Sequence, residues 1–211
     1  MKANLFATAY MAPVQQFCRL IQGGRMVEER CENYVKQTYR NRAVILGSNG
    51  PVALTIPIER TGENHIPIAE ALISPHNNWR HNHWQTLLSA YESSPFFRFY
   101  ADELREVLFA PTERLVDFNE MLLRLFCRWL FIDLDLSYTQ QYEAHPSDET
   151  VDFRSCISPK CGWRLDEAFT PVPYYQVFGA RFGFIPNLSI ADLVFNMGPA
   201  SRLVLLDSLK K

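Results

Sequence analysis

The sequence predicts a mixed α/β fold, in which a small mixed β-sheet with an early β-hairpin packs against several helices. Three observations predict this class. Short runs rich in β-branched residues occupy the first third of the chain, apolar residues with helical spacing fill the middle, and a helical pattern returns near the C-terminus. The 211 residues, 47% of them hydrophobic, suit a single domain over 1–211 that buries a sizeable core.

The first elements are predicted to be a strand, a helix and a second strand. Residues 4–10 (NLFATAY) have the composition of a strand. Pro13 fits the first turn of a helix over 13–23, which the pair Gly23-Gly24 ends. Residues 26–30 (MVEER) predict another strand, which the charges keep short.

The clearest local pattern is a β-hairpin over residues 42–58, RAVILGSNGPVALTIPI. Two β-rich runs flank Asn49-Gly50, a pair that favours a two-residue hairpin turn. Pro57 has no N–H to donate, so it either places the second strand at an edge or ends it early. A further short strand is expected over 68–73.

Three helices and a strand are predicted for the middle of the chain. Residues 79–91 and 96–109 carry apolar residues at helical spacing, and a third helix with a broad apolar face opens at Pro111-Thr112. A strand over 132–138 follows. Residues at about 140–173 are polar and hold four prolines, so they predict a long irregular segment.

The C-terminal part is predicted to contain two helices. Ser189 can cap the first, and Asp192 lies three residues later, which is the spacing of a capping box. Gly198 suits the exit of this helix. Pro199 suits the start of a final helix over 199–209.

The composition excludes several classes of protein. A formal net charge of −2 gives no broad basic field, so nucleic acid is not an expected partner. No apolar run approaches the length of a membrane span. The five cysteines are irregularly spaced, which favours free thiols in a reducing compartment and predicts a cytoplasmic protein. The sequence contains no G-x-S-x-G, P-loop or G-x-G-x-x-G motif, and it predicts no cofactor and no particular oligomeric state.

Residues 77–88, NNWRHNHWQTLL, raise the question of a metal site. In a helix over 79–91, His81 and His83 point about 200° apart and cannot share an ion, so no metal is predicted. His83 lies at the edge of the buried face, four residues after Trp79. Two interpretations of His83 stay open: a half-buried histidine bonded within the domain, or a general acid/base or substrate contact.

A basic cluster precedes the hairpin in the stretch YVKQTYRNR. It contains Lys36, Arg40 and Arg42. If the strand continues back through Arg40, the two arginines share a face and suit a phosphate, a carboxylate or a nucleotide-sugar diphosphate. The alternative is a solvated strand start paired with the glutamates of residues 28–32.

Other candidate groups give weaker signals. Asp192 suits a catalytic acid, although helix capping is the default reading. The aromatic and glycine-rich stretch 173–187 either packs as a plug or lines a ligand cleft. Cys31 lies among acidic residues, which makes it a poor candidate nucleophile. The pair Cys156 and Cys161 has no second pair, so it does not predict zinc.

Five stretches, in order along most of the chain, resemble the WbqC-like family. Each is short, but the ordered set is specific. They are TAYMAPVQQFCRLI at 8–21, YVKQTYRNRAVI at 34–45, LTIPI at 54–58, WRHNHWQTLLSAYESSPFF at 79–97 and FIPNLSIADLVFNMGP at 184–199.

The resemblance implies a role in sugar chemistry. Members occur among genes for O-antigen and related surface polysaccharides, and transfer of glycine or a similar acyl group to an amino sugar has been suggested for them. His83 and Asp192 are the expected catalytic residues. The expected substrate-binding residues are Tyr10, Lys36, Arg40, Asn41, Arg42, Tyr175, Gln176, Asn187 and Asn196.

The chain departs from the family pattern at two places. Many relatives carry the acidic pair of D-D-V-Q after the second strand, where this chain has EERCENYV at 28–35. Many relatives have a histidine in a Y-P-Q-L-H-G stretch, where this chain has Phe178. If that histidine is catalytic in relatives, Phe178 argues against catalysis here.

Three functions therefore stay open. The first is an acyl or aminoacyl transferase that acts on an amino sugar or nucleotide sugar, with small molecules as its partners. The second is a non-catalytic ligand-binding or scaffold protein, which the departure at Phe178 favours. The third is a nucleotide-binding, adenylate-forming enzyme, because the first strand followed by Y-M-A-P-V-Q-Q-F resembles the strand–loop–helix entry of nucleotidylyltransferases.

Overall fold

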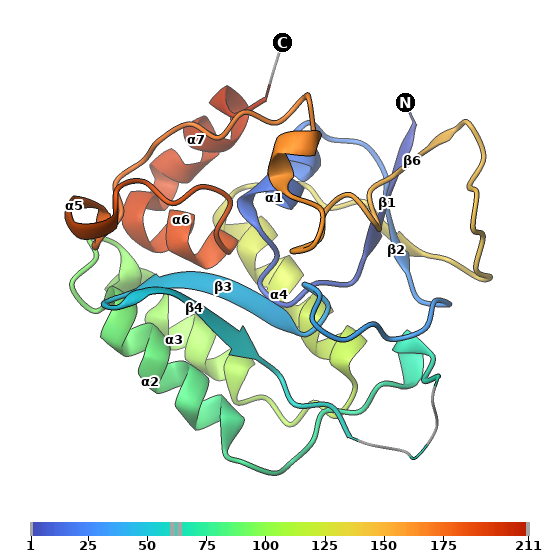
Figure 1. The fold of residues 1–211 in the computed structure, drawn as a ribbon, viewed down its shortest axis with the longest axis horizontal. Coiled ribbons are helices and arrows are strands. Elements are labelled where there is room, and N and C mark those ends of the chain that lie inside the picture. The colour runs from blue at the N-terminus through green and yellow to red at the C-terminus, as the bar shows by residue number, and fades with distance from the viewer. Residues whose placement is uncertain (1, 60–61, 63–64, 210–211) are drawn as a thin grey trace.

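A parallel sheet, a separate hairpin and a set of helices make up the protein (Figure 1). The structure is a computed structural model that describes residues 2–59, 62 and 65–209. Figure 1 shows the N-terminal helix beside the C-terminal helices, with the marks of both chain ends at the top of the view. The predicted mixed α/β class is confirmed.

The chain begins with a parallel β-α-β unit. Strand β1 (Ala3–Ala7) leads through helix α1 (Val14–Ile21) to strand β2 (Met26–Glu29), which pairs with β1 in parallel. The predicted order of strand, helix and strand is confirmed, and each element is shorter than predicted.

Two more strands complete the parallel sheet. Strand β5 (Leu136–Tyr138) pairs with β2, and strand β6 (Thr150–Asp152) pairs with β1, so the order across the sheet is β5-β2-β1-β6. The strand predicted over 132–138 is confirmed in its last three residues. Strand β6 and the 3₁₀ helix η2 (Trp163–Leu165) lie in the segment predicted to be irregular, and neither was predicted.

The hairpin forms a sheet of its own. Strand β3 (Arg42–Gly47) pairs antiparallel with β4 (Gly50–Thr55), and neither strand pairs with the parallel sheet. The expectation of one mixed sheet is therefore wrong. Because Gly47 pairs with Gly50, the loop consists of Ser48 and Asn49, one residue earlier than predicted. Gly50 has a φ of 106°, a conformation that favours glycine.

The strand predicted over 68–73 is wrong. This region contains the 3₁₀ helix η1 (Ile68–Glu70) and two isolated bridges, which join Ile73 to Ile58 and Leu72 to Arg114. Its backbone groups therefore bond to separate segments instead of forming a continuous ladder with one partner.

The three predicted middle helices are confirmed. They are α2 (Trp79–Tyr91), α3 (Phe97–Leu108) and α4 (Leu115–Trp129). Helix α4 supplies much of the hydrophobic core, because Phe118 and Leu122 lie one turn apart on its apolar face and are fully buried. Among the described residues, no helix has both the length and the apolar character needed to cross a membrane.

The C-terminal helices are also confirmed. After the short helix α5 (Gly179–Phe182), helix α6 (Ile190–Met197) ends at Gly198. A 3₁₀ turn, η3 (Gly198–Ala200), leads into helix α7 (Ser201–Asp207), within the predicted range 199–209.

Ser189 caps α6 as predicted, but the capping box does not form. The Ser189 Oγ accepts a hydrogen bond from the Ala191 N–H at 3.2 Å. The Asp192 side chain does not return to the cap; it accepts hydrogen bonds from Tyr91 and Tyr174 in the interior.

Candidate functional site

The candidate site lies at the carboxyl edge of the parallel sheet. Open parallel α/β sheets bind ligands outside the carboxyl ends of their strands, at the point where the connections diverge. Numbered by their order in the chain, the four parallel strands lie as 3-2-1-4 across the sheet. The connection from β1 runs toward β2, away from β6, so the connections diverge beside β1 and β6.

The two faces of the sheet have different neighbours. Phe6 and Met26 lie in the hydrophobic core. Leu5 and Val27 point to the opposite face, because successive side chains of a strand alternate. The segment 139–149, which joins β5 to β6, lies over that face and is the loop that extends away from the helices in Figure 1.

A buried ion pair crosses the carboxyl edge on this second face. Glu29, at the end of β2, is fully buried, and its carboxylate accepts hydrogen bonds from the Thr139 hydroxyl at 2.7 Å and from Arg154 Nη1 at 2.7 Å. Ala7 pairs with Glu29 on the intervening strand, and its methyl group leaves room for the guanidinium. The ion pair therefore joins the ends of β2 and β6.

Arg154 makes further hydrogen bonds besides its ion pair with Glu29. Its guanidinium donates to both carboxylate oxygens of Asp152, at 3.0 and 2.7 Å, and to the backbone carbonyl of Glu143 at 2.8 Å. The hydrogen bond to Asp152 is the largest of the effects that raise the pKa of Arg154, so the side chain stays charged. The guanidinium is therefore fixed in position.

A pocket of about 300 Å³, which we call the carboxyl-edge pocket, lies between this face and segment 139–149. Leu5 and Val27 form an apolar floor, and hydrogen-bonding groups surround it. Small-molecule sites commonly combine apolar surface with a few polar groups that fix orientation. The rest of the lining comes from Glu29, Thr139, Gln140, Gln141, Glu143, Pro146, Thr150 and Arg154.

Glu143 is the carboxylate of this pocket that a ligand can reach. Glu29 is buried and paired with Arg154, whereas Glu143 is exposed. No ion pair of Glu143 is found in the described part of the chain, and its Oε1 accepts a hydrogen bond from Gln141 at 3.0 Å. The pocket can therefore offer a negative charge to an amine or hydroxyl group.

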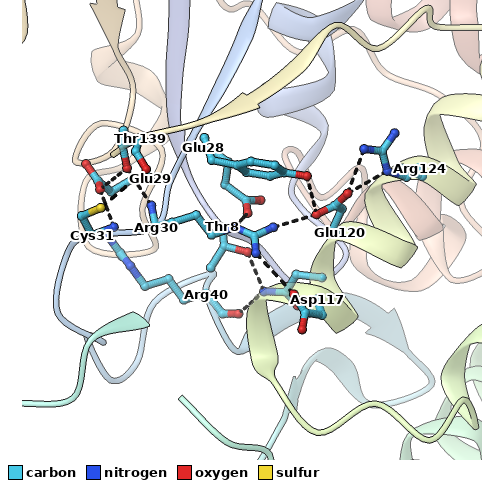
Figure 2. Close-up of polar contacts among 12 residues, drawn as sticks. Thr8, Glu28, Glu29, Arg30, Cys31, Arg40, Asp117, Glu120, Arg124 and Thr139 are labelled. Carbon is cyan, nitrogen blue, oxygen red and sulfur yellow. Dashed lines mark hydrogen bonds and ion pairs between the residues drawn. The ribbon is translucent and has the colours of Figure 1, made fainter. Parts of the chain in front are cut away.

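On the helix-facing side of the same edge, a second network joins the sheet to α4 (Figure 2). Arg30 contacts Glu28 at 2.5 Å and Glu120 of α4 at 2.7 Å, and Glu120 also accepts hydrogen bonds from Arg124 and Tyr138. Burial raises the pKa of Glu28 to about 7, against the opposite effect of the Arg30 guanidinium. These contacts fix the end of β2.

Comparison with known proteins agrees with the resemblance found in the sequence. Residues 9–162 match the profile of the WbqC-like protein family. The chain belongs to the WbqC-like protein family. It is also similar to "Uncharacterized protein Rv1507c" of Mycobacterium tuberculosis (strain ATCC 25618 / H37Rv), with 29% identity over 186 residues, 78% of this chain and 80% of the relative. No solved structure matches the chain significantly. The family match includes every lining residue of the pocket except Leu5.

His83 of this WbqC-like protein lies in the core, outside the pocket. Its Nδ1 is 3.0 Å from the Tyr10 hydroxyl, and its ring packs edge-on against Trp79. Burial lowers the pKa of His83 to about 4, although a backbone hydrogen bond with Thr55 acts the other way. The neutral imidazole joins α2 to the segment after β1, and His81 is exposed.

Asp192 is the centre of a buried hydrogen-bond network. Its carboxylate accepts hydrogen bonds from Tyr91 at 2.7 Å, Tyr174 at 2.8 Å and Gln176 at 2.9 Å. Burial raises its pKa, and these three donors act in the opposite direction. Asn196 donates to the backbone carbonyl of Asp192 at 2.8 Å. The network holds the segment before α5 against α2 and α6.

Asn187 completes the N-terminus of α1. Its Oδ1 accepts a hydrogen bond from the Gln15 N–H at 2.9 Å, and the Leu188 carbonyl accepts one from the Val14 N–H at 2.9 Å. A helix N-terminus after a first parallel strand is a common phosphate site. Here the two donors are already bonded to the C-terminal part of the chain.

The basic cluster before the hairpin does not form a shared face. Strand β3 begins at Arg42, so the expectation that the strand continues through Arg40 is wrong. Arg40 is buried and pairs with Glu32, as the alternative interpretation proposed in part, whereas Arg42 contacts the Thr55 hydroxyl at 3.3 Å. The Asn41 side chain donates to the backbone just after β4.

None of the sequence-predicted site residues lines the pocket at the carboxyl edge. Lys36 and Tyr175 are exposed, and the others make the structural contacts described above. Their roles in catalysis and binding stay predictions. Sequence reasoning missed Glu29, Thr139 and Arg154. One signal pointed to this edge: two glutamates stand at the end of a predicted strand.

Metal ligands are not clustered in the part of the chain that the structure describes. No group of three or more His, Cys, Asp or Glu side chains is placed there to hold an ion. All five cysteines are free thiols.

Proposed function

We propose that the carboxyl-edge pocket binds a sugar and that the protein transfers an acyl or aminoacyl group, such as glycyl, to it. The observation that carries this proposal is the lining of the pocket. A sugar ring has C–H faces that suit the floor of Leu5 and Val27. Its hydroxyl edges suit the surrounding amides and hydroxyls of Gln140, Gln141 and Thr150.

The charge of the pocket favours an amino sugar as acceptor. Arg154 is already neutralised by Glu29 and Asp152, so it adds little attraction for an anionic ligand. Glu143 has no cationic partner among the described residues and can attract an ammonium group. The setting among polysaccharide genes, which the WbqC-like resemblance implies, supports the same acceptor class, either free or linked to a nucleotide.

In the proposed reaction, the bound ammonium group first loses one proton to solvent. The resulting amine nitrogen of the sugar then attacks the carbonyl carbon of an activated acyl ester or thioester. A C–N bond forms, and the bond from that carbon to the leaving group breaks, with its electron pair going to the leaving group. The proton of the nitrogen passes to the Glu143 carboxylate, which then protonates the leaving group.

Thermal unfolding with added sugars tests the proposal. Glucosamine is expected to raise the melting temperature more than glucose does, because only the amine can pair with Glu143. Glu143→Gln is expected to remove the difference between the two sugars. The matched control Glu92→Gln changes an exposed carboxylate directly after α2, outside the pocket lining, and should keep the difference.

The outcomes of this experiment separate the functions. If no amino sugar or nucleotide-linked sugar changes the melting temperature, the transferase proposal fails. Binding without transfer from any activated acyl donor would favour the non-catalytic binding protein.

The adenylate-forming alternative has one observation in its favour, the strand order 3-2-1-4. The contacts of Asn187 and Leu188 oppose it, because they occupy the amide groups of α1 that would bind phosphate. We therefore expect ATP, with or without magnesium, to leave the melting temperature unchanged. A clear rise with ATP would favour this alternative instead.

A further inference from the structure

We propose that residues 140–148 are a lid over the carboxyl-edge pocket and that Arg154 is the residue that holds it closed around a single sugar ring. The lid is inferred from contacts of the protein alone. The identity of the enclosed ring rests on the proposed function.

The lid residues have no regular secondary structure and bury few side chains of their own. The stretch QQYEAHPSD contains no helix or strand, and all of its side chains except Pro146 are exposed. A segment that buries so little apolar surface is stabilised mainly by its few polar contacts.

Both ends of the segment are anchored to the sheet. Before the lid, the Thr139 N–H donates to the Glu28 carbonyl at 3.1 Å, and the Thr139 hydroxyl donates to Glu29. After the lid, the Glu149 carbonyl accepts a hydrogen bond from the Ala3 N–H at 2.9 Å. The ends of the lid therefore have fixed positions about which it can move.

Between these ends, the side chain of Arg154 contacts the middle of the lid. Arg154 donates a hydrogen bond to the middle of the lid, from Nη2 to the Glu143 carbonyl at 2.8 Å, and the Thr150 N–H of β6 donates one to the Ser147 carbonyl near the end of the lid at 2.9 Å. The same guanidinium lies 5.1 Å from the centre of the Tyr142 ring, at a distance suited to a cation–π contact.

Arg154 itself is part of the rigid edge. It is buried, and Glu29 and Asp152 fix its guanidinium as described above. The lid can therefore move without disturbing Arg154, because Glu143 and Tyr142 are the parts of the contact that belong to the lid. The same bond sets the position of Glu143 over the pocket.

The volume of the pocket beside the lid indicates what it can hold. The pocket measures about 300 Å³, at the lower end of the range of about 300–1,000 Å³ that is typical for small-molecule sites. This space suits one ring and is small for a whole nucleotide sugar. The nucleotide part of such a ligand would lie outside the lid.

Limited proteolysis with a Glu-specific protease tests the lid, because Glu143 lies within it. The cleavage rate after Glu143 follows the population of the open form when opening is fast. Arg154→Lys keeps the charge but loses the planar fork that reaches three partners, so cleavage is expected to become roughly tenfold faster. Tyr142→Ala leaves Arg154 and Glu29 intact, so the fold is not at stake, and is expected to accelerate cleavage by a smaller factor.

The control is Arg128→Lys, which changes an exposed arginine of α4 that pairs with Glu103 of α3. It should leave the rate of cleavage after Glu143 unchanged. If Tyr142→Ala and a folded Arg154→Lys variant are both cleaved at the wild-type rate, the lid is overturned.

Glucosamine supplies the second arm of the experiment. It is expected to slow cleavage of the wild-type protein after Glu143, and faster cleavage in the two variants together with this slowing supports the whole proposal. If glucosamine raises the melting temperature without slowing cleavage, enclosure of the ring is overturned. If the variants are cleaved faster but no sugar changes either quantity, the lid is supported and the proposed transferase function fails.

Discussion

At the scale of the residue, the buried ion pair of Arg40 and Glu32 carries a clear energetic expectation. Two hydrogen bonds of 2.7 and 2.6 Å join the side chains, which are 8% and 10% exposed. Loss of one partner leaves a buried charge without compensation. Arg40→Met is therefore expected to lower the free energy of unfolding by about 3–5 kcal/mol, whereas the double variant with Glu32→Leu should recover most of this loss. Urea denaturation measures both changes.

The matched control is Arg42→Met, because Arg42 has no ion pair among the described residues and contacts only a hydroxyl at 3.3 Å. Its effect should be within about 0.5 kcal/mol. A double variant as unstable as Arg40→Met alone would contradict the expectation. If the double variant lost its response to sugars while remaining folded, Arg40 would return as a binding residue.

At the scale of the element, α1 depends on a residue far away in the chain. The Asn187 side chain accepts the Gln15 N–H at the helix N-terminus, and Asn187 itself has a φ of 55°. Asn187→Ala removes the acceptor and adds a Cβ in an unfavourable conformation. Asn187→Gly removes only the acceptor. We expect Ala to lower the free energy of unfolding by about 1–2 kcal/mol and Gly to lower it by less. Thermal unfolding can rank the two variants.

Hydrogen exchange gives the readout specific to this element. Loss of the cap should speed exchange of the Gln15 amide in both variants, and Asn82→Ala, an exposed change on α2, should not. Equal exchange of the Gln15 amide in all four proteins would show that Asn187 does not cap α1.

At the scale of the whole molecule, two buried groups give stability opposite dependences on pH. Burial raises the pKa of Glu28 from 4.5 to about 7, so the folded state binds this proton more tightly than the unfolded state. The stability that results is fully present below pH 4.5 and is lost as the pH rises through 7. Burial lowers the pKa of His83 from 6.5 to about 4, so stability linked to its neutral form is complete above pH 6.5 and is lost as the pH falls toward 4. Between pH 4.5 and 6.5, the two groups therefore change the free energy of unfolding in opposite directions as the pH rises.

Single variants should reveal how each group alone makes the free energy of unfolding depend on pH. Glu28→Gln leaves the effect of His83, so the free energy of unfolding should rise between pH 4.5 and 6.5. His83→Gln leaves the effect of Glu28, so stability should fall over the same range. Denaturant titrations at both limits provide the measurement, with the wild type expected to lie between the variants. Identical slopes in all three proteins would contradict this account.

Local signals explain which parts of the fold could be predicted. Pro13, Gly198 and the Asn49-Gly50 pair act on their immediate neighbours, and the apolar spacing of α4 reflects its own buried face. Strand β6 has three residues and takes its place only by pairing with β1, so its sequence carries no comparable signal.

The candidate site was harder to predict, because its parts come from separate strand ends. Arg154 and Glu29 are 125 residues apart in the chain and meet across a third strand. The basic cluster was misread for a related reason: the partner of Arg40 lies in the preceding loop, so Arg40 turns inward before β3 begins. His83 was a candidate because of its residue type, and the structure places it in the core beside Tyr10.

The contact between Asn187 and α1 also has a consequence for synthesis of the chain. Gln15 and Asn187 are 172 residues apart, and Ser189 reaches across 178 residues to the backbone of Met11. A growing chain emerges N-terminus first, so α1 leaves the ribosome long before its capping partner exists. During this interval the start of the helix must bond to water or to a chaperone. Nascent chains that end before Asn187 should therefore leave α1 frayed, and the first helix should be among the last elements to become fully ordered.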